Sequence, residues 1–345
     1  MFPDTVGSAS RDGSPRRTTG RERVMRRLSV VLIAVGAFLV VLAPMIRFYA
    51  YPRLAVAPAN QVSETGLQAT GAQVFDISTL KTITADLKIQ VITHGDASTP
   101  KSHPDDVTYV NSTLTKTSDG KLLSGEIERM SFDKRTGQAS SCCKDFIADE
   151  KDAPGVPVTH EGLVAKFPFQ TEKKTYQFWD STLRTANPIY YKGTSKLEGL
   201  TVYKFEQTIA PTQYGTQEVP LSLLGLPGDS NVTAPEMYSN TRTLWVEPET
   251  GVIIQRQENQ LNTMDYQGAP RVTLTKAVIS YDDKTLRKNV DDYGAQGSRL
   301  KLARSTGPEL AFVLGLVSIL AGIVMGRRRQ TTGGARVKEM AGATA

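Results

Sequence analysis

The sequence has few of the residues that enzymes and metal proteins use for chemistry. Its 345 residues include two cysteines and three histidines. Two cysteines exclude a scaffold held by many disulfides, and three histidines leave little material for a histidine-rich metal site. The sequence also lacks a Gly-x-Ser-x-Gly elbow, a His-Glu-x-x-His motif and a glycine-rich phosphate loop. We therefore predict no enzyme activity, no catalytic residue, no metal site and no cofactor.

The middle of the chain also lacks a basic excess. The formal net charge is +6, but residues 28–326 contain 29 basic and 31 acidic residues, so the positive charge lies in the two ends. A protein that binds nucleic acid needs a concentrated basic surface to neutralise phosphates. The composition therefore predicts no nucleic-acid partner.

Two long runs carry no charge. They are Leu28–Ile46 and Leu310–Gly326, with 19 and 17 residues, and a helix of this length nearly crosses a hydrocarbon core about 30 Å thick. Arginines precede the first run and follow the second, and the positive-inside rule then places both termini in the cytoplasm. The alternatives are a buried core helix for either run, and for the first a signal peptide cleaved near Ala55–Ala57.

The runs divide the chain into five predicted segments. Residues 1–27 and 327–345 are cytoplasmic tails with compositions typical of disorder. Residues 28–46 and 310–326 are transmembrane helices, and residues 47–309 form one extracytoplasmic domain. This arrangement predicts a plasma-membrane protein that crosses the bilayer twice.

The segment between the runs alternates apolar and polar residues, which is typical of half-buried β-strands. Ile83–Val91 alternates over nine positions, and turn-forming sequences such as Ser118–Gly120 separate the expected strands. Because the connections are short, neighbouring strands are expected to be antiparallel. We predict a mainly β domain with strands in residues 83–91, 106–113, 121–132, 200–208, 241–246, 252–262 and 272–281.

Two of the expected turns share a pattern. Phe132–Gly137 and Val246–Gly251 both read apolar, acidic, two variable residues, Thr and Gly. The acid can accept hydrogen bonds from the backbone of the turn, and glycine can adopt a positive φ. The pattern indicates a duplicated sheet unit, and chance similarity between two hairpins is the alternative.

Two resemblances extend this interpretation. The hairpin Thr243–Ile254 resembles the signature hairpin of lipoprotein-carrier proteins of the LolA and LppX type, which implies a strongly curved antiparallel sheet around an apolar cavity for an acyl chain. Over nearly its whole length, the chain resembles the actinobacterial membrane family known as domain of unknown function 3068, also called PorA-type porins. This second resemblance implies an actinobacterial envelope protein and no particular mechanism. It rests on both apolar runs, on the Cys142–Cys143 pair and on Lys166–Phe169, Thr175–Asp180, Leu200–Gln207 and Met237–Gly251.

The two cysteines, Cys142 and Cys143, are adjacent. Thiols on the outer side of a bacterial membrane tend to be oxidised, so we predict a disulfide between these neighbours. Two free buried thiols, or one bond between two chains, are the alternatives. The pair makes a poor metal site in this interpretation, because only His160 lies nearby in the sequence.

Aromatic residues are concentrated between Phe167 and Tyr191. Aromatic side chains can line an apolar groove, and core filling is the alternative. Our candidate lipid-contact residues are Phe167, Phe169, Phe178 and Trp179.

These observations predict a membrane-anchored module that binds or hands over an envelope lipid or glycolipid. A non-catalytic structural or assembly partner in an envelope complex is the alternative. An enzyme ranks below both, and a porin ranks last because the expected strands carry charged residues without a continuous lipid-facing belt. The expected partners are the bilayer, contacted through both helices, an envelope lipid or glycolipid, and an envelope protein.

Overall fold

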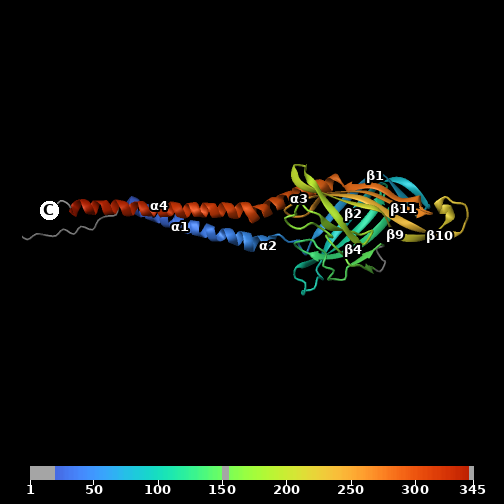
Figure 1. The fold of residues 1–345 in the computed structure, drawn as a ribbon, viewed down its shortest axis with the longest axis horizontal. Helices are drawn as coiled ribbons and strands as arrows, with labels where there is room; N and C mark the ends of the chain where they lie inside the picture. The colour runs from blue at the N-terminus through green and yellow to red at the C-terminus, as the bar shows by residue number, and fades with distance from the viewer. Residues whose placement is uncertain (1–19, 150–154, 342–345) are drawn as a thin grey trace, which may run out of the picture. The chain divides into compact units, whose positions relative to one another are not determined.

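The structure is a computed structural model that describes residues 20–149 and 155–341 (Figure 1). It contains two compact units. A helical unit comprises the described residues up to Ala50 and those from Leu302 onward, and a β unit comprises Tyr51–Lys301. Most of the first predicted tail, residues 1–19, lies outside the described residues.

The helical unit consists of two long helices that lie side by side. They are α1 (Gly20–Met45) and α4 (Gly307–Ala341), with π-helical turns at Ile46–Ala50 and Leu302–Thr306. Both helices are longer than the apolar runs, and α4 continues through residues 327–341, which we had assigned to a disordered tail. Two helical stretches are long and apolar enough to cross a membrane, Val24–Leu54 and Asp283–Arg327.

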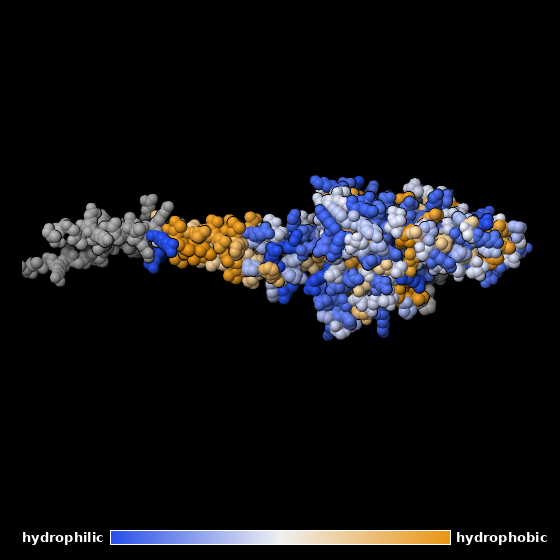
Figure 2. Space-filling model, in the orientation of Figure 1, coloured by the Kyte–Doolittle hydropathy of each residue, from blue (hydrophilic) through white to orange (hydrophobic). Residues whose placement is uncertain are grey.

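Small residues form the contact between α1 and α4. A Cβ atom added to Gly36 would lie 2.6 Å from the Gly315 carbonyl oxygen, and one added to Gly322 would lie 2.9 Å from the Ser29 carbonyl oxygen. The Ser29 hydroxyl donates to the Gly322 carbonyl at 2.7 Å. Such close approach through small residues is typical of helix pairs in lipid. Larger apolar side chains such as Phe38 are exposed. Figure 2 shows a hydrophobic surface over these helices.

The β unit contains one 12-stranded antiparallel sheet in the order β6-β5-β4-β3-β2-β1-β12-β11-β10-β9-β8-β7. Residue Leu163 forms bridges with Gln138, which follows β4, and with Phe178 in β7, so the segment after β4 is linked to the edge strand β7. The predicted fold class is confirmed, since the chain is mainly β with apolar helices at both ends. The strands are β1 (Val62–Asp76), β2 (Lys81–Asp96), β3 (Asp106–Thr117), β4 (Leu122–Asp133), β5 (Phe146–Ala148), β6 (Val156–Pro157), β7 (Tyr176–Asp180), β8 (Thr185–Leu197), β9 (Leu200–Pro220), β10 (Asn231–Val246), β11 (Ile253–Tyr266) and β12 (Ala269–Tyr281).

The seven expected strands overlap β2, β3, β4, β9, β10, β11 and β12, most of which extend beyond the predicted bounds. Strands β1, β5, β6, β7 and β8 and one helix were not predicted. Strand β1 was missed because its buried apolar residues are only Leu67, Ala69, Ala72 and Val74, and a register shift between Ala69 and Ala72 interrupts their alternation. Helix α3 (Asp283–Lys301) was missed because it is strongly charged and buries only Thr285, Gly297 and Leu300. The remaining short helices are α2 (Tyr51–Leu54) and the 3₁₀ turn Leu221–Leu224.

The two related turns have matching structures. Asp133 Oδ1 accepts hydrogen bonds from the Arg135 and Thr136 amides at 3.0 and 2.7 Å. Glu247 accepts corresponding bonds from the amides of the second and third residues after it. The glycines that end the turns, Gly137 and Gly251, both have a φ of +72°. The shared sequence pattern therefore encodes one turn geometry at two places in the sheet.

Candidate functional site: the polar cavity of the β unit

The β unit surrounds a cavity of about 490 Å³. Because side chains alternate between the two faces of a strand, every second residue over part of β3, β4 and β11 reaches this cavity. Apolar residues from β2 and β12 contribute, as does α3 through Tyr293 and Gln296. The polar lining from the three strands comprises Tyr109, Asn111, Thr113, Thr115, Glu126, Glu128, Arg256, Glu258 and Gln260.

A buried histidine lies beside the cavity wall between two carboxylates. The His160 Nδ1 atom is 2.9 Å from Asp145 Oδ2, and its Nε2 atom is 3.1 Å from Glu128 Oε1. Trp179 Nε1 in β7 also donates to Glu128 in β4, at 2.9 Å, so this group links the edge strand β7 to β4. Burial favours the neutral imidazole, but the two carboxylates outweigh it and raise the pKa of His160 to about 9.

A second buried ionic group surrounds Arg242 in β10. Its guanidinium donates to Glu258 Oε1 at 2.7 Å and to Asp180 Oδ2 at 3.0 Å. Two further acceptors, the Gln207 side chain and the Trp179 carbonyl, lie 2.8 and 3.1 Å away. Burial opposes ionisation of Glu258, but Arg242 and Arg256 hold the pKa of this carboxyl far below its usual range. Glu258 on the cavity wall is therefore held in position by Arg242, which does not line the cavity itself.

Two further cavity residues have strongly shifted pKa values. Burial raises the pKa of Glu126 to about 7, and the neighbouring charges of Glu128 and Asp149 add to the shift. Burial lowers the pKa of Lys166 to about 7. The Lys166 Nζ atom has no hydrogen-bond partner among the described residues and lies 3.7 Å from the centre of the Phe169 ring. The cavity therefore presents carboxylates together with an amine that titrates near neutral pH.

The four candidate lipid-contact residues do not form one surface. Phe167 is fully buried in the main apolar core, with Phe205 and Leu244 among its neighbours. Phe169, Phe178 and Trp179 border the cavity, but Phe178 also belongs to that core and Trp179 is bonded to a carboxylate. The aromatic segment therefore combines core filling with part of a polar cavity wall.

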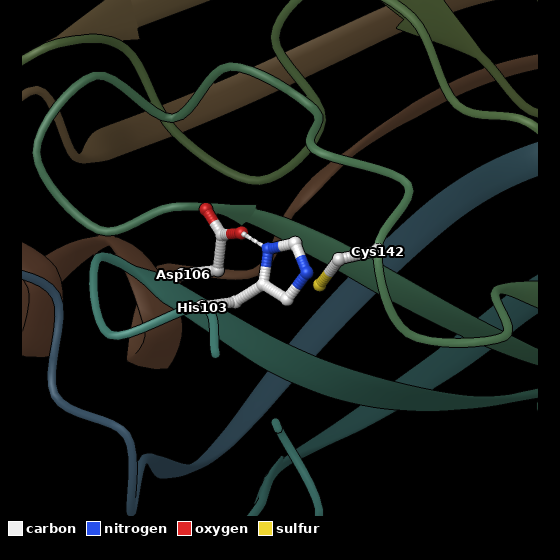
Figure 3. A group of neighbouring side chains, drawn as sticks. All are labelled: His103, Asp106 and Cys142. Atoms are coloured by element: carbon white, nitrogen blue, oxygen red, sulfur yellow. Dashed lines mark hydrogen bonds and ion pairs between the residues drawn. The ribbon is translucent and has the colours of Figure 1, made fainter. Parts of the chain in front are cut away.

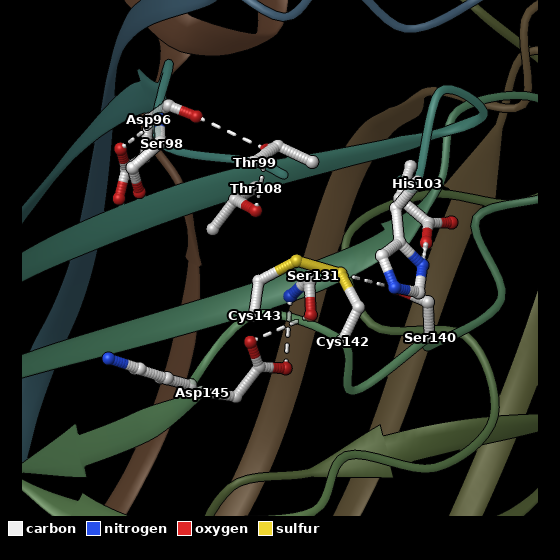
Figure 4. Close-up of a disulfide and its surroundings, with 12 residues drawn as sticks. Asp96, Ser98, Thr99, His103, Thr108, Ser131, Ser140, Cys142, Cys143 and Asp145 are labelled. Atoms are coloured by element: carbon white, nitrogen blue, oxygen red, sulfur yellow. Dashed lines mark hydrogen bonds and ion pairs between the residues drawn. A yellow bond between two sulfur atoms is a disulfide. The ribbon is translucent and has the colours of Figure 1, made fainter. Parts of the chain in front are cut away.

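In the structure, Cys142 and Cys143 are bonded to each other (Figure 4). The Ser140 hydroxyl lies 3.6 Å from Cys142 Sγ, and Arg129 donates to the Cys143 carbonyl. The imidazole that lies within 4.8 Å of Cys142 Sγ is that of His103, whereas the His160 ring is bonded to Asp145 and Glu128.

Sequence reasoning missed the buried charges, although one signal was available. In β10, Asn240 and Arg242 have the same strand parity as Leu244 and Val246, which are fully buried. A charged residue in phase with buried apolar residues points into the interior, where it needs a charged partner. The partners Asp180 and Glu258 come from β7 and β11, and no local pattern identifies them.

Comparison with known proteins identifies the family. The family model described as "Porin PorA" matches residues 28–324. The chain belongs to this porin PorA family. It is 23% identical to the Porin PorA of Corynebacterium resistens, over 88% of this chain and 97% of the relative. It is 24% identical to the Porin PorA of Corynebacterium amycolatum, over 86% of this chain and 97% of the relative.

The family overturns our functional prediction. We expected a module that binds or hands over a lipid or glycolipid, or else a non-catalytic assembly partner, and ranked a porin last. The relatives are named porins. The physical reason for the error lies in the cavity, because Glu126, Glu128 and Glu258 make its wall unsuitable for an acyl chain. The resemblance to PorA-type porins is confirmed, and porin relatives describe a cell-envelope membrane protein.

Proposed function

We propose that this chain is a non-enzymatic, pore-forming protein of the cell envelope, and that the cavity of the β unit forms part of its solute path. The observation that carries the proposal is the charged lining supplied by β3, β4 and β11. Water-filled channels are lined by polar and charged side chains, whereas cavities for acyl chains are apolar. The names of the relatives support the same function.

The fixed charges suit a path for small hydrated solutes. Glu258 and Arg256 lie on the wall and contact each other, and Arg242 behind them holds Glu258 in place. Glu128 is held in the same way by His160 and Trp179. A wall with fixed charges can replace part of the hydration shell of a passing solute without rearranging.

We further propose that α1 and α4 anchor the protein in the plasma membrane as two spans. The outer face of the sheet supports this anchoring, because exposed Lys88, Lys116 and Lys276 interrupt its apolar positions. Arginines at residues 21–27 and at 327–329 favour cytoplasmic ends, which would place the β unit on the outer side. Reporter fusions after Thr331 test this orientation, and activity only on the outer side would contradict it.

A path across the bilayer requires more than one copy in this proposal. The glycine contacts bring α1 and α4 too close together to enclose a passage. Their outward apolar side chains, such as Phe38 and Leu320, are available to lipid and to further copies of the chain. The proposed partners are therefore the bilayer and the protein itself.

Planar-bilayer recordings of the purified full chain test the pore. The discriminating variants are Thr113→Cys, whose position lines the cavity, and Ser112→Cys, which follows the opposite strand parity. We expect stepwise conductance from both variants. A bulky thiol reagent should lower conductance in Thr113→Cys and leave Ser112→Cys unchanged.

Two results would contradict parts of the proposal. Absence of conductance steps from well-folded, reconstituted protein would contradict the pore itself. Steps that the reagent leaves equal in Thr113→Cys and Ser112→Cys would place the path outside the β unit. Folding of each variant is checked by the fluorescence of its two tryptophans, both of which lie in the β unit.

A further inference from the structure

Three side chains with metal-binding atoms converge at one end of the β3–β4 hairpin (Figure 3). They are His103 in the loop before β3, Asp106 as the first residue of β3, and Cys142 between β4 and β5. One ligand atom of each lies within 4.8 Å of the other two, and His103 Nδ1 is 3.2 Å from Asp106 Oδ2. The His103 side chain is 45% exposed, so an ion in solution can reach the cluster.

Both loops that carry the cluster are held in place. In the first, the His103 amide donates to the Pro100 carbonyl at 2.9 Å, and Lys134 donates to the Pro104 carbonyl at 2.6 Å. In the second, the Ser140 amide donates to the Ser131 carbonyl in β4 at 3.0 Å. Two anchored loops keep the three side chains near one another without a bound ion, which lowers the cost of binding one.

The cluster has the donor set of a zinc site except for one feature. Imidazole, carboxylate and thiolate are the usual protein ligands of Zn²⁺, and three of them with a water complete a tetrahedral shell. In the structure, however, Cys142 is bonded to Cys143 (Figure 4), and a disulfide sulfur is not a thiolate. Metal binding by all three residues therefore requires the reduced protein.

We propose that reduction of the Cys142–Cys143 disulfide creates a Zn²⁺ site formed by Cys142, His103 and Asp106. The reductant is a dithiol. Its thiolate attacks one sulfur, the resulting mixed disulfide is released by the second thiol, and two electrons and two protons pass to Cys142 and Cys143 while the dithiol becomes a disulfide. Zn²⁺ then displaces the proton of the Cys142 thiol, and water is the fourth ligand.

The positions of the two cysteines favour this division of roles. Adjacent cysteines close a small ring, and constrained disulfides exchange readily with thiols. Cys143 is buried, whereas Cys142 is half-buried and faces His103. Cys143 therefore prevents metal binding by Cys142 while the disulfide is intact, and reduction of the disulfide frees the Cys142 sulfur to bind the ion. The site does not depend on the proposed pore, because none of its residues lines the cavity.

Metal titration of the full chain in detergent tests the proposal, with Co²⁺ as an optical probe and Zn²⁺ as its competitor. The protein is reduced with a dithiol, which is then removed without air. We expect a thiolate-to-cobalt charge-transfer band only after reduction, and its loss when Zn²⁺ is added. Cys142→Ser should abolish the band, and His103→Ala or Asp106→Asn should weaken binding about 10-fold or more.

Two variants separate this site from adventitious binding. Cys143→Ser leaves Cys142 as a free thiol and should bind Co²⁺ without reduction. The matched control His94→Ala removes another histidine of the β unit and should bind like the unaltered chain. Equal binding before and after reduction, or a Cys142→Ser variant that keeps the band, would overturn the proposal. Absence of the band in both the reduced chain and Cys143→Ser would also overturn it.

Discussion

The helical unit and the β unit place their apolar and polar side chains in opposite ways. In α1 and α4, large apolar side chains face outward and small residues form the contact, as lipid favours. In the β unit, polar residues line both the outer face and the cavity, and charged groups such as Arg242 are buried between them. Packing of small residues therefore holds the helical unit together, whereas the β unit depends also on pairs of buried charges.

The strongest test of this contrast removes the central charge of the β unit. Arg242→Met leaves Asp180 and Glu258 buried without their main cation, and breaking such a group costs about 3–5 kcal/mol of unfolding free energy. Lys174→Met removes an exposed partner of Glu172 and should lower the unfolding free energy far less. Chemical denaturation followed by tryptophan fluorescence measures both. Equal losses in the two variants would show that the buried charges do not hold the β unit together.

The second test uses pH, because the β unit contains buried titrating groups. His160 has its pKa raised from 6.5 to about 9, so the folded state holds its proton more tightly than the unfolded state. The contribution of His160 to the free energy of unfolding is about 3 kcal/mol. It is fully present below pH 6.5 and is lost as the pH rises through 9. Lys166 has its pKa lowered to about 7, so its effect on the free energy of unfolding has the opposite sign: it raises stability as the pH increases above 7. The charged groups that face His160 are Asp145 and Glu128.

His160→Gln isolates the histidine contribution to this pH dependence. We expect the variant to be less stable than the unaltered chain at pH 6, and the difference to shrink as the pH approaches 9. Denaturation at a series of pH values measures it, and Lys166→Met serves as the control that removes the opposing slope. A constant difference between pH 6 and 9 would mean that His160 is not charged in the folded protein.

The third test addresses the helical unit. Gly36→Ala would place a Cβ atom 2.6 Å from the Gly315 carbonyl oxygen and 2.7 Å from Ile319 Cγ1, so the helices must separate locally. Overpacking of this kind costs about 1–3 kcal/mol. The control is Phe38→Ala, which shortens a side chain that is 64% exposed.

Cross-linking between the helices measures this effect. A Cβ atom at Gly326 would lie 3.5 Å from Ser29 Oγ, so cysteines at these two positions should form a disulfide readily. Gly36→Ala should lower the yield, and Phe38→Ala should leave it unchanged. An undiminished yield in Gly36→Ala would indicate that the glycine contact does not determine how closely the helices pack.

The same contrast explains what the sequence could reveal. Composition alone identifies the two apolar runs, because a helix that crosses a bilayer needs a segment of fixed length without charged side chains. Alternation located strands such as β2 and β11, since that signal is local. The cavity wall could not be found in this way, because Glu128 meets His160 and Trp179 only after distant segments are brought together. The charged residues on the expected strands were interpreted only as the lack of a lipid-facing belt and not as a cavity lining, and a porin was therefore ranked too low.

The last test compares the two related turns of the β unit, Phe132–Gly137 and Val246–Gly251, which share a sequence pattern and a geometry. Asp133 uses a single oxygen, Oδ1, to accept bonds from the Arg135 amide and from the amide and hydroxyl of Thr136. Glu247 divides its bonds between both oxygens, with Oε1 accepting from the Glu249 amide and Oε2 from Thr250. An amide side chain keeps only one acceptor oxygen.

Asp133→Asn can therefore preserve all three bonds, and we expect a loss below about 0.5 kcal/mol, typical of a substitution that breaks no contact. Glu247→Gln must direct an NH₂ group at a backbone N–H inside a buried site, which costs about 1–3 kcal/mol. Denaturation of the two variants under identical conditions measures the difference. Equal losses would mean that the two turns depend on the charge of the acid rather than on how its oxygens are shared. The turns would then depend on a charged side chain, as the interior around Arg242 does.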